Sequence, residues 1–313
     1  MKRILVAGGS GLLGGACCVH FSENFETFFS FHDHGVKIKG CNGWKVDLSN
    51  ERQAQKFVQK VNPDAIINTV ALTNLELCEE KPLLAEKVNV ETARNTAIAA
   101  KDNGSKLIHI STNYVFDGER GNYSEEDTPK AAGVYSCTKI EGDEAVLAVK
   151  PEYNIVRTCI FGWNIVPERK NSVSWIYDAL SRGQKISALT DQYMNIILAN
   201  SLAENLELLV NSPKQGIYNI SAHGSLSKFE LASRVAELYG FDKSLIGKST
   251  LKEFYDKGIF KAKRPRDGSL TIQKFEKEFK VKLPSMDEDL AKFRKLGEQN
   301  YLSNFKLASP SRQ

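Results

Sequence analysis

The chain begins with a short apolar stretch that runs directly into a glycine-rich loop. Ile4–Ala7 is followed by Gly8-Gly-Ser-Gly-Leu-Leu-Gly14, and an apolar, small-residue stretch extends from there to Phe21. Glycines at such a turn let the backbone approach a pyrophosphate, and the following helix presents free N–H groups to the same anion. A plain glycine-rich turn is the alternative. The position between a strand and a helix favours a dinucleotide-binding loop.

Short apolar runs and longer amphipathic stretches alternate through the first half of the chain. Strands are expected at Ile4–Ala7, Thr27–Phe31, Trp44–Val46, Ala65–Asn68, Leu107–Ser111 and Asn154–Thr158. Helices are expected at Leu12–Phe21, Glu51–Val61, Leu83–Asp102 and Val134–Val149. This alternation implies right-handed crossovers and an α/β fold with a doubly wound parallel sheet of the Rossmann type. Ligands of such sheets bind beyond the carboxyl ends of the strands.

The pattern is looser beyond Ile160. Further elements are expected at Ser172–Ser181, Ile217–Ile220, Ser227–Tyr239 (with Ser227 as the N-cap) and Asp287–Tyr301. We therefore expect a dinucleotide-binding domain over 1–160 and a smaller, mainly substrate-binding C-terminal lobe over 161–306. Part of 190–222 is expected to return to the sheet, and 307–313 to form a frayed tail.

The composition excludes several classes of protein. The chain has 313 residues, 42% of them hydrophobic, which is enough for a large buried core. A net charge of +4, spread along the chain, does not indicate nucleic-acid binding. No apolar run approaches the roughly 20 residues that span a bilayer. The six cysteines lack metal-site spacing and are typical of reduced thiols. We expect a soluble, cytoplasmic protein without a metal, nucleic-acid or membrane partner.

Two acidic residues are candidates for contact with the adenosine half of a dinucleotide. Asp33 lies about 20 positions after the glycine loop, where a carboxylate would hold the ribose 2′-hydroxyl of NAD. His32 and His34 flank it and could accompany a 2′-phosphate instead, so NAD and NADP both remain open. Asp47 and Leu48 are candidates for contact with the adenine, although this segment is equally typical of the first turn of a helix.

Tyr135 and Lys139 are candidates for the catalytic pair. Four residues apart on a helix, they lie on one face. A nearby cation favours the phenolate and would lower the tyrosine pKa from about 10 toward neutrality. Such a tyrosine can act as a general acid to a carbonyl or as a base to an alcohol. The spacing alone is also common on solvated helical faces.

A hydroxyl group at the end of a strand supports this pair. Thr112 follows the strand expected to end at Ser111, and there its hydroxyl can hydrogen-bond the oxygen of a reacting carbonyl. The alternative is a turn in which the hydroxyl of Ser111 or Thr112 merely caps the chain. The glycine loop, the strand-end hydroxyl and the tyrosine–lysine helix occur in an order that indicates an NAD(P)-dependent oxidoreductase.

With these motifs, the sequence resembles the extended short-chain dehydrogenase/reductase family, and within it the dTDP-4-dehydrorhamnose reductase branch. The resemblance covers most of residues 1–240 and is densest before 160. It rests on Gly8/Gly11/Gly14, Asp47-Leu48, Asn68–Ala71, Cys78-Glu79, Val88–Val90, Ser111–Gly118, Tyr135/Lys139, Arg157-Thr158, Thr190–Gln192 and Gly216–Asn219. It implies an enzyme that reduces a nucleotide-linked 4-keto-6-deoxy sugar with NADPH or NADH, in dTDP-rhamnose and polysaccharide biosynthesis. A homodimer is left open.

The resemblance also implies a role for individual residues. Thr112 would orient the carbonyl oxygen, Tyr135 would donate the proton, and Lys139 would bind the nicotinamide ribose and tune Tyr135. The expected cofactor contacts are Gly8, Gly11, Leu12, Leu13, Gly14, Asp33, Asp47, Leu48, Val70, Ala71, Thr73, Asn89, Tyr135 and Lys139. The expected substrate contacts are Asn113, Val115, Trp163, Asn171 and Arg264.

Departures from the branch keep other functions open. Asn113 stands where the branch usually has aspartate, and Met194–Ile197 replaces a Gly-Ser-Pro-Thr-like turn. A cofactor-binding but non-catalytic subunit, resembling the methionine adenosyltransferase β subunit, is one alternative; a nucleotide-sugar epimerase or dehydratase is another. Trp163 is as typical of a core aromatic as of a ring that stacks on substrate. Lys263, Arg264 and Arg266 fit a diphosphate or a solvated basic loop.

Overall fold

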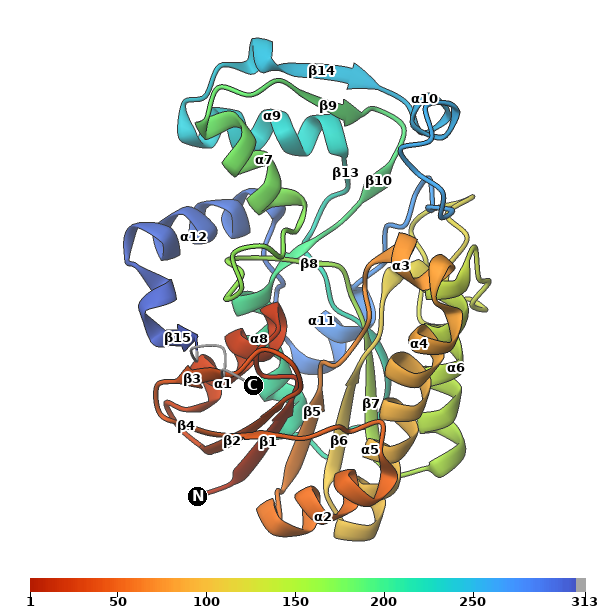
Figure 1. The fold of residues 1–313 in the computed structure, drawn as a ribbon, viewed down its shortest axis with the longest axis vertical. Coiled ribbons are helices and arrows are strands. Elements are labelled where there is room, and N and C mark those ends of the chain that lie inside the picture. The colour runs from red at the N-terminus through yellow and green to blue at the C-terminus, as the bar shows by residue number, and fades with distance from the viewer. Residues whose placement is uncertain (308–313) are drawn as a thin grey trace, which may run out of the picture.

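A seven-stranded parallel sheet forms the centre of the larger lobe in the computed structural model, which describes residues 1–307 (Figure 1). Its strands, in spatial order, are β12 (Gly216–Asn219), β7 (Glu152–Arg157), β6 (Lys106–Ile110), β5 (Ala65–Asn68), β1 (Arg3–Ala7), β2 (Glu26–Phe31) and β4 (Cys41–Lys45). The order reverses between β1 and β5, which is the switch point where ligands of doubly wound sheets bind. The predicted Rossmann-type fold class is confirmed.

Helices cover both faces of this sheet because alternate strand residues point to opposite sides. Ile4 and Val6 of β1 share one core with α1 and α8, whereas Leu5 and Ala7 share another with α2, α5 and α6. The helices of the first face are α1 (Leu12–Phe21) and α8 (Ala199–Val210), with α11 (Gln273–Phe279) beside them. Those of the second face are α2 (Glu51–Val61), α5 (Thr92–Asn103) and α6 (Val134–Val149).

The helix expected over Leu83–Asp102 is interrupted. The segment forms α4 (Pro82–Glu86), a π-helical turn (Lys87–Glu91) and then α5, preceded by an unexpected short helix α3 (Leu75–Glu80). The π-helical turn carries Asn89, whose Oδ1 accepts from the N–H of Leu72 at 2.8 Å and whose Nδ2 donates to Thr138 Oγ1 at 3.0 Å. Wider turns of this kind are frequent at functional sites. Here the turn brings one amide between the loop after β5 and helix α6.

The smaller lobe stands over the carboxyl ends of the strands, which we call the carboxyl edge of the sheet (Figure 1). It contains β8 (Ile160–Phe161), α7 (Ser172–Ser181), β9 (Ile186–Leu189), β10 (Tyr193–Met194), β11 (Ile197–Leu198), β13 (Leu226–Ser227), α9 (Lys228–Tyr239), β14 (Ile246–Ser249), α10 (Leu251–Asp256) and α12 (Met286–Glu298). Helices α7, α9 and α12 enclose a core of their own. Ser227 caps α9 as expected: its Oγ accepts from Glu230 N at 3.1 Å, and the Glu230 side chain accepts from Ser227 N.

The chain then returns to the larger lobe. Helix α12 ends at Glu298, three residues earlier than expected, because Asn300 adopts a left-handed conformation with φ of 55° before a 3-10 turn. Strand β15 (Phe305–Leu307) pairs antiparallel with β3 (Val36–Ile38). The rest of the predicted frayed tail, 308–313, lies outside the described residues. No helix within residues 1–307 is both long enough and apolar enough to cross a membrane.

Candidate active site

The glycine loop between β1 and α1 is too tight for side chains. Gly8 has a φ of +85°, and the Gly11 N–H donates to its carbonyl oxygen at 2.9 Å. A Cβ on Gly14 would overlap that same oxygen. The start of α1 therefore lies against the loop, as pyrophosphate binding at a helix N-terminus requires. Leu13, an expected contact, buries its side chain in the core instead, which leaves only its backbone for a ligand.

A cavity of about 310 Å³ lies beside this loop. Residues of the loop, the ends of β2 and β5, the segment after β4 and helix α4 line it. Seven of the expected cofactor contacts are among them: Gly8, Gly11, Asp33, Asp47, Leu48, Val70 and Ala71. The other seven are not part of this lining: Leu12, Leu13, Gly14, Thr73, Asn89, Tyr135 and Lys139. Asn89 instead holds the loop at Leu72 that forms one wall.

Charges of both signs surround the cavity. Asp33 Oδ1 lies 2.7 Å from His32 Nδ1, and both side chains are exposed. Burial opposes, but hydrogen bonds from Ser49 together with Lys87, 3.7 Å away, hold the pKa of Asp47 below its usual value. Arg169 also lines the cavity. It comes from the smaller lobe, and sequence analysis missed it because nothing local marks it.

Thr112 and Tyr135 meet at the carboxyl end of β6. Tyr135 is the second residue of α6 and is 8% exposed; its ring lies edge-on to that of Tyr114, with 6.0 Å between centroids. Thr112 caps the short turn after β6 by accepting from Tyr114 N at 3.2 Å. Burial raises the pKa of Tyr135 well above its usual value, and the hydrogen bond with Thr112 opposes this rise. The tyrosine is therefore held as a neutral phenol.

We had expected Lys139 to make Tyr135 acidic, and it does not. Its Nζ is buried and donates to the carbonyl oxygen of Ile110 at 2.9 Å. Burial lowers the pKa of Lys139, and the carboxylate of Asp143, one turn further along α6, opposes that change. The predicted lowering of the Tyr135 pKa is wrong: the largest effect on it is burial, which raises the pKa because it removes the phenol from water.

A buried polar network lies beneath the pair, and sequence analysis missed it. Asp143 accepts from Ser111 Oγ at 2.7 Å and lies 3.5 Å from His109 Nε2. Asn68 of β5 contacts the other ring nitrogen of His109 at 3.2 Å. Burial raises the pKa of Asp143 despite the charge of Lys139. The carboxylate four residues after Lys139 was a usable signal, because it lies on the same helical face.

Most of the expected substrate contacts are committed to protein partners. Asn113 is fully buried and donates through Nδ2 to the carbonyl oxygen of Gly268 at 2.8 Å. Val115 is buried in a small apolar cluster. Asn171 caps α7, and its Nδ2 donates to Gly162 O at 2.7 Å. The side-chain amides of Asn113 and Asn171 are therefore used in hydrogen bonds within the protein.

Trp163 belongs to the core of the smaller lobe. Its ring stacks on Phe293 of α12, with centroids 4.2 Å apart and planes 10° from parallel. Its Nε1 donates to the Phe293 carbonyl oxygen at 2.9 Å. Both its apolar face and its polar atom are thus used internally. Of the two interpretations that the sequence left open for Trp163, these contacts favour the core aromatic over a ring that stacks on substrate.

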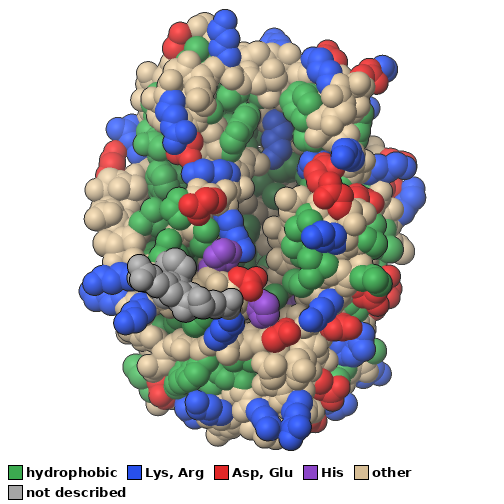
Figure 2. All heavy atoms as spheres, in the orientation of Figure 1, with side chains coloured by type: hydrophobic (Ala, Val, Ile, Leu, Met, Phe, Trp, Pro, Cys, Tyr) green, Lys and Arg blue, Asp and Glu red, His purple; other side chains and the backbone are tan. Residues whose placement is uncertain are grey.

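Arg264 contacts the larger lobe. Its guanidinium forms an ion pair with Glu76 of α3 at 2.9 Å. Burial raises the pKa of Tyr114, and Arg264 opposes this rise. Glu76 also accepts from Ala262 N at 2.9 Å, which ties this loop to the larger lobe. Lys263 and Arg266 are exposed. The molecular surface is hollowed between the two lobes (Figure 2).

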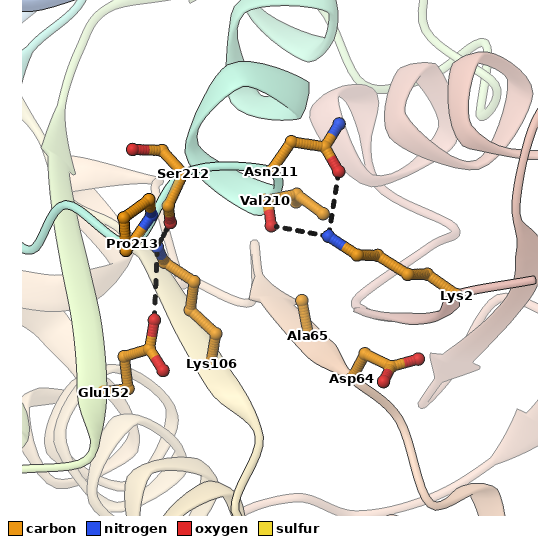
Figure 3. A pocket seen from close by; sticks show the side chains of 9 residues that line it. All are labelled: Lys2, Asp64, Ala65, Lys106, Glu152, Val210, Asn211, Ser212 and Pro213. Atoms are coloured by element: carbon orange, nitrogen blue, oxygen red, sulfur yellow. Dashed lines mark hydrogen bonds and ion pairs between the residues drawn. The ribbon is translucent and has the colours of Figure 1, made fainter.

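A second pocket lies at the opposite, amino edge of the sheet (Figure 3). Its buried Lys106 donates to the carbonyl oxygens of Ser212 and Lys214 and lies 3.4 Å from Glu152. Lys2 donates to Asn211 Oδ1 at 3.0 Å. Both lysines bind groups at or just beyond the C-terminal end of α8, which needs such donors. The role of this pocket is therefore structural: its lysines join the amino ends of the strands to the C-terminal end of α8.

The sheet, the glycine loop and the tyrosine–lysine helix together define an extended short-chain dehydrogenase/reductase. Comparison of the sequence with known families agrees. The chain belongs to the family described as the RmlD substrate binding domain, whose model matches residues 1–297. The predicted family is confirmed.

Individual relatives are similar over most of their length. The chain is 27% identical to the probable low-salt glycan biosynthesis reductase Agl14 of Haloferax volcanii, covering 91% of this chain and 95% of that protein. It is 26% identical to the methionine adenosyltransferase 2 subunit beta of Pongo abelii, covering 88% and 82%. The crystal structure of dTDP-4-dehydrorhamnose reductase from Bacillus anthracis in complex with NADP superposes with a TM-score of 0.83 at 26% identity, covering 94% of this chain and 98% of that one.

Proposed function

We propose that this protein reduces the 4-keto group of a nucleotide-linked 4-keto-6-deoxy sugar, with NADPH or NADH as the reductant. One observation carries the proposal: a neutral, buried Tyr135 hydroxyl lies beside the Thr112 hydroxyl, at the same sheet edge as the glycine loop. Similarity to a glycan biosynthesis reductase and to dTDP-4-dehydrorhamnose reductase supports the same chemistry.

The residues around the glycine loop fit a dinucleotide. Gly8, Gly11 and the start of α1 would hold the pyrophosphate, while Asp47 and Leu48 would flank the adenosine. When bound, NADPH or NADH supplies the hydride. Asp33 would favour the 2′-hydroxyl of NADH; His32, His34 and Arg169 would favour the 2′-phosphate of NADPH, so either form is consistent with these charges.

The side chains at the end of β6 would manage the proton. Thr112 would orient the carbonyl oxygen, and Tyr135, neutral in its resting state, would donate to that oxygen as negative charge develops there. The phenolate left behind needs a cation, which Lys139 supplies from the next turn of α6. Asp143 would keep that lysine charged in its dry surroundings.

Turnover by the purified protein tests the proposal. We expect oxidation of NADPH or NADH, followed at 340 nm, only when a nucleotide-linked 4-keto-6-deoxy sugar is present. Tyr135→Phe should lower kcat by roughly 100-fold or more, since a positioned proton donor contributes about that much, and should leave cofactor affinity unchanged. Tyr153→Phe, a change on β7 away from the site, serves as the control. Full activity of Tyr135→Phe would show that the proton comes from elsewhere.

A second candidate function has its own support. The similarity to methionine adenosyltransferase 2 subunit beta, together with the commitment of Asn113 to Gly268, fits a cofactor-binding subunit without turnover. That function predicts stable association with a partner enzyme and no oxidation of NADPH or NADH with any keto sugar. The complete set of Thr112, Tyr135 and Lys139 favours the reductase.

A further inference from the structure

The catalytic helix α6 begins without a cap of its own. Its N-cap residue is Gly133, which has no side chain to accept a hydrogen bond from the first N–H groups of the helix. Tyr135 is the second residue of α6, so its hydroxyl is only as well placed as the first turn is. A first turn whose N–H groups lack partners frays readily, and fraying here would displace the proton donor.

A carboxylate from another helix supplies the cap. Glu79 lies in α3, and its Oε1 accepts from the N–H of Val134, the first residue of α6, at 2.9 Å. Its negative charge also lies at the positive end of the α6 dipole, which strengthens the contact. The two residues are 55 positions apart in the chain. The start of the catalytic helix is therefore fixed by a tertiary contact.

Gly133 leaves the space that this carboxylate occupies. A Cβ on Gly133 would lie 2.5 Å from Glu79 Oε1. Apart from the chain neighbours of Gly133, the only atoms among the described residues within 4 Å of that Cβ belong to Glu79. The backbone of Gly133 is extended, with a φ of −166°, and any residue can adopt this conformation. A glycine is needed here for the approach of the carboxylate and not for its backbone angles.

The smaller lobe holds the same short helix from its other side. Glu76, one turn before Glu79, accepts from two backbone N–H groups of the segment 261–264 at 3.1 and 2.9 Å and forms an ion pair with Arg264 at 2.9 Å. This segment follows α10, and α3 lies between it and α6 (Figure 1). A shift of the segment relative to the larger lobe would therefore act on the helix that caps α6.

We propose that α3 positions the catalytic tyrosine, and that Glu79 is the positioning residue through which it acts on α6. The inference rests on the proposed function, in which Tyr135 is the proton donor. Cys78 of α3 belongs to the same buried cluster as Tyr135, so α3 packs near the ring as well as capping the backbone. Through Glu76 and Glu79, the smaller lobe is connected to the tyrosine by two carboxylates on consecutive turns of one helix.

Hydrogen exchange and turnover of the full-length protein test the inference together. Exchange is followed by mass spectrometry on the peptide that contains Tyr135, and kcat and KM are measured with a nucleotide-linked 4-keto-6-deoxy sugar. Glu79→Ala removes the cap, whereas Glu79→Gln keeps an oxygen that can accept from Val134. Glu80→Ala, which removes the exposed carboxylate at the last position of α3, is the matched control.

A second-site variant makes the test specific to the cap. In Glu79→Ala the space beside Gly133 is open, so Gly133→Ser can be added without overlap. A serine at the N-cap accepts a hydrogen bond from the first turn through its own side chain. The double variant Glu79→Ala/Gly133→Ser should therefore recover what Glu79→Ala loses.

We expect the start of α6 to exchange about fivefold faster in Glu79→Ala, which is the usual size of the effect of a lost cap. Its kcat should be lower by about tenfold, because the proton donor is misplaced, and its KM for the keto sugar should change less. Glu79→Gln should retain most of the protection and of the rate, and Glu80→Ala should match wild type.

Unchanged exchange in Glu79→Ala would overturn the inference. So would faster exchange with a wild-type kcat, or a kcat that the double variant fails to restore although exchange returns to normal. The absence of keto-sugar-dependent oxidation of NADPH or NADH by the wild type is a separate result. It would contradict the proposed function, and the exchange measurements would still decide whether Glu79 fixes the start of α6.

Discussion

The two edges of the central sheet both hold buried lysines, and their surroundings differ. At the amino edge, Lys106 contacts the carbonyl oxygen of Ser212 and the Glu152 carboxylate (Figure 3). It also donates to the carbonyl oxygen of Lys214, so each of its donors has a partner. At the carboxyl edge, Lys139 makes one hydrogen bond, to Ile110. Lys228, in the lobe above that edge, makes one with Ser172.

The difference separates structural cations from available ones. A lysine whose donors are all used stabilises the fold and has nothing left for a ligand. A buried lysine with spare donors costs stability, and such groups persist where they act on something that the protein binds. We therefore expect the amino edge to carry structure and the carboxyl edge to carry chemistry, since ligands of open parallel sheets bind at the carboxyl ends of the strands.

Replacing Lys139 and Lys106, one at a time, by methionine should give the largest contrast between an effect on activity and an effect on stability. Lys139→Met should lower kcat/KM by about 1,000-fold through loss of the charge that supports proton transfer. Lys106→Met should leave kcat/KM unchanged and cost about 1–3 kcal/mol of unfolding free energy, because carbonyl groups lose their donor. Turnover and denaturant unfolding measure the two effects. The Lys139→Met/Asp143→Asn double variant avoids an unpaired buried carboxylate; appreciable activity in it would break the comparison.

The glycine loop extends the contrast to a residue without charge. Gly14→Ala should weaken NADPH and NADH binding by at least about tenfold, or ~1.4 kcal/mol, because its Cβ overlaps the Gly8 carbonyl oxygen. Gly247→Ala on β14 is the control, since a Cβ there makes only an ordinary contact at 3.4 Å. Fluorescence titration of the reduced cofactor measures both. Unchanged affinity in Gly14→Ala would mean that the loop does not hold the dinucleotide.

Asp143 offers a subtler test, through the pH dependence of kcat/KM. Burial lowers the pKa of Lys139, and Asp143 opposes this, so Asp143→Asn should lower that pKa further. Loss of the protonated lysine should then begin at lower pH. We expect the alkaline limb of the profile to move down by about one pH unit, which corresponds to ~1.4 kcal/mol. Glu144→Gln, an exposed neighbour, should leave the profile in place. A purely structural Asp143 would change the rate equally at every pH.

Much of the larger lobe could be predicted because its signals are local. Helices α1, α2 and α6 begin and end at the expected residues, and the Asn50 side chain caps α2 by accepting from Gln53 N. Hydrophobic periodicity and caps are properties of neighbouring residues. The glycine loop and the meeting of Thr112 with Tyr135 follow from the order of the strands. Asp143 could have been added from its spacing to Lys139.

What sequence reasoning missed depends on contacts between distant segments. The π-helical turn at Asn89 follows from bonds to Leu72 and Thr138, neither of which is a neighbour in the chain. The sequence around Trp163 is the same for a ring in the core as for a ring that stacks on a ligand, so only the contact with Phe293 distinguishes the two. Arg169 reaches the cavity of the larger lobe only through the way the smaller lobe is placed. The predicted direction of the Tyr135 pKa shift was wrong because desolvation depends on the packing of segments that are distant in the sequence.

The smallest expected effect isolates the cost of burying the Lys228 ammonium group, which donates to the Ser172 hydroxyl and has no carboxylate partner within residues 1–307. Because burial lowers the folded-state pKa of Lys228, the folded protein releases this proton at a lower pH than the unfolded chain does. Below the pKa that Lys228 has in the folded protein, the lysine is charged in both the folded and the unfolded chain, and folding bears the full cost of desolvating that charge. Between this pKa and the ordinary value of about 10.4, the folded protein loses the proton and the cost is progressively relieved. Lys228→Met should therefore have a higher Tm than wild type at pH 7, by about 2–4 °C for each kcal/mol.

This advantage should shrink as the pH rises toward that value. Differential scanning fluorimetry of the two proteins across pH 7–10, without ligands, measures it as a difference in which the other titrating groups cancel. Lys106→Met should behave in the opposite sense at pH 7 and be less stable than wild type, because its donors are all used. If Lys228→Met also proved less stable, Lys228 would be a structural cation like Lys106, and the distinction between the two regions would fail for the smaller lobe.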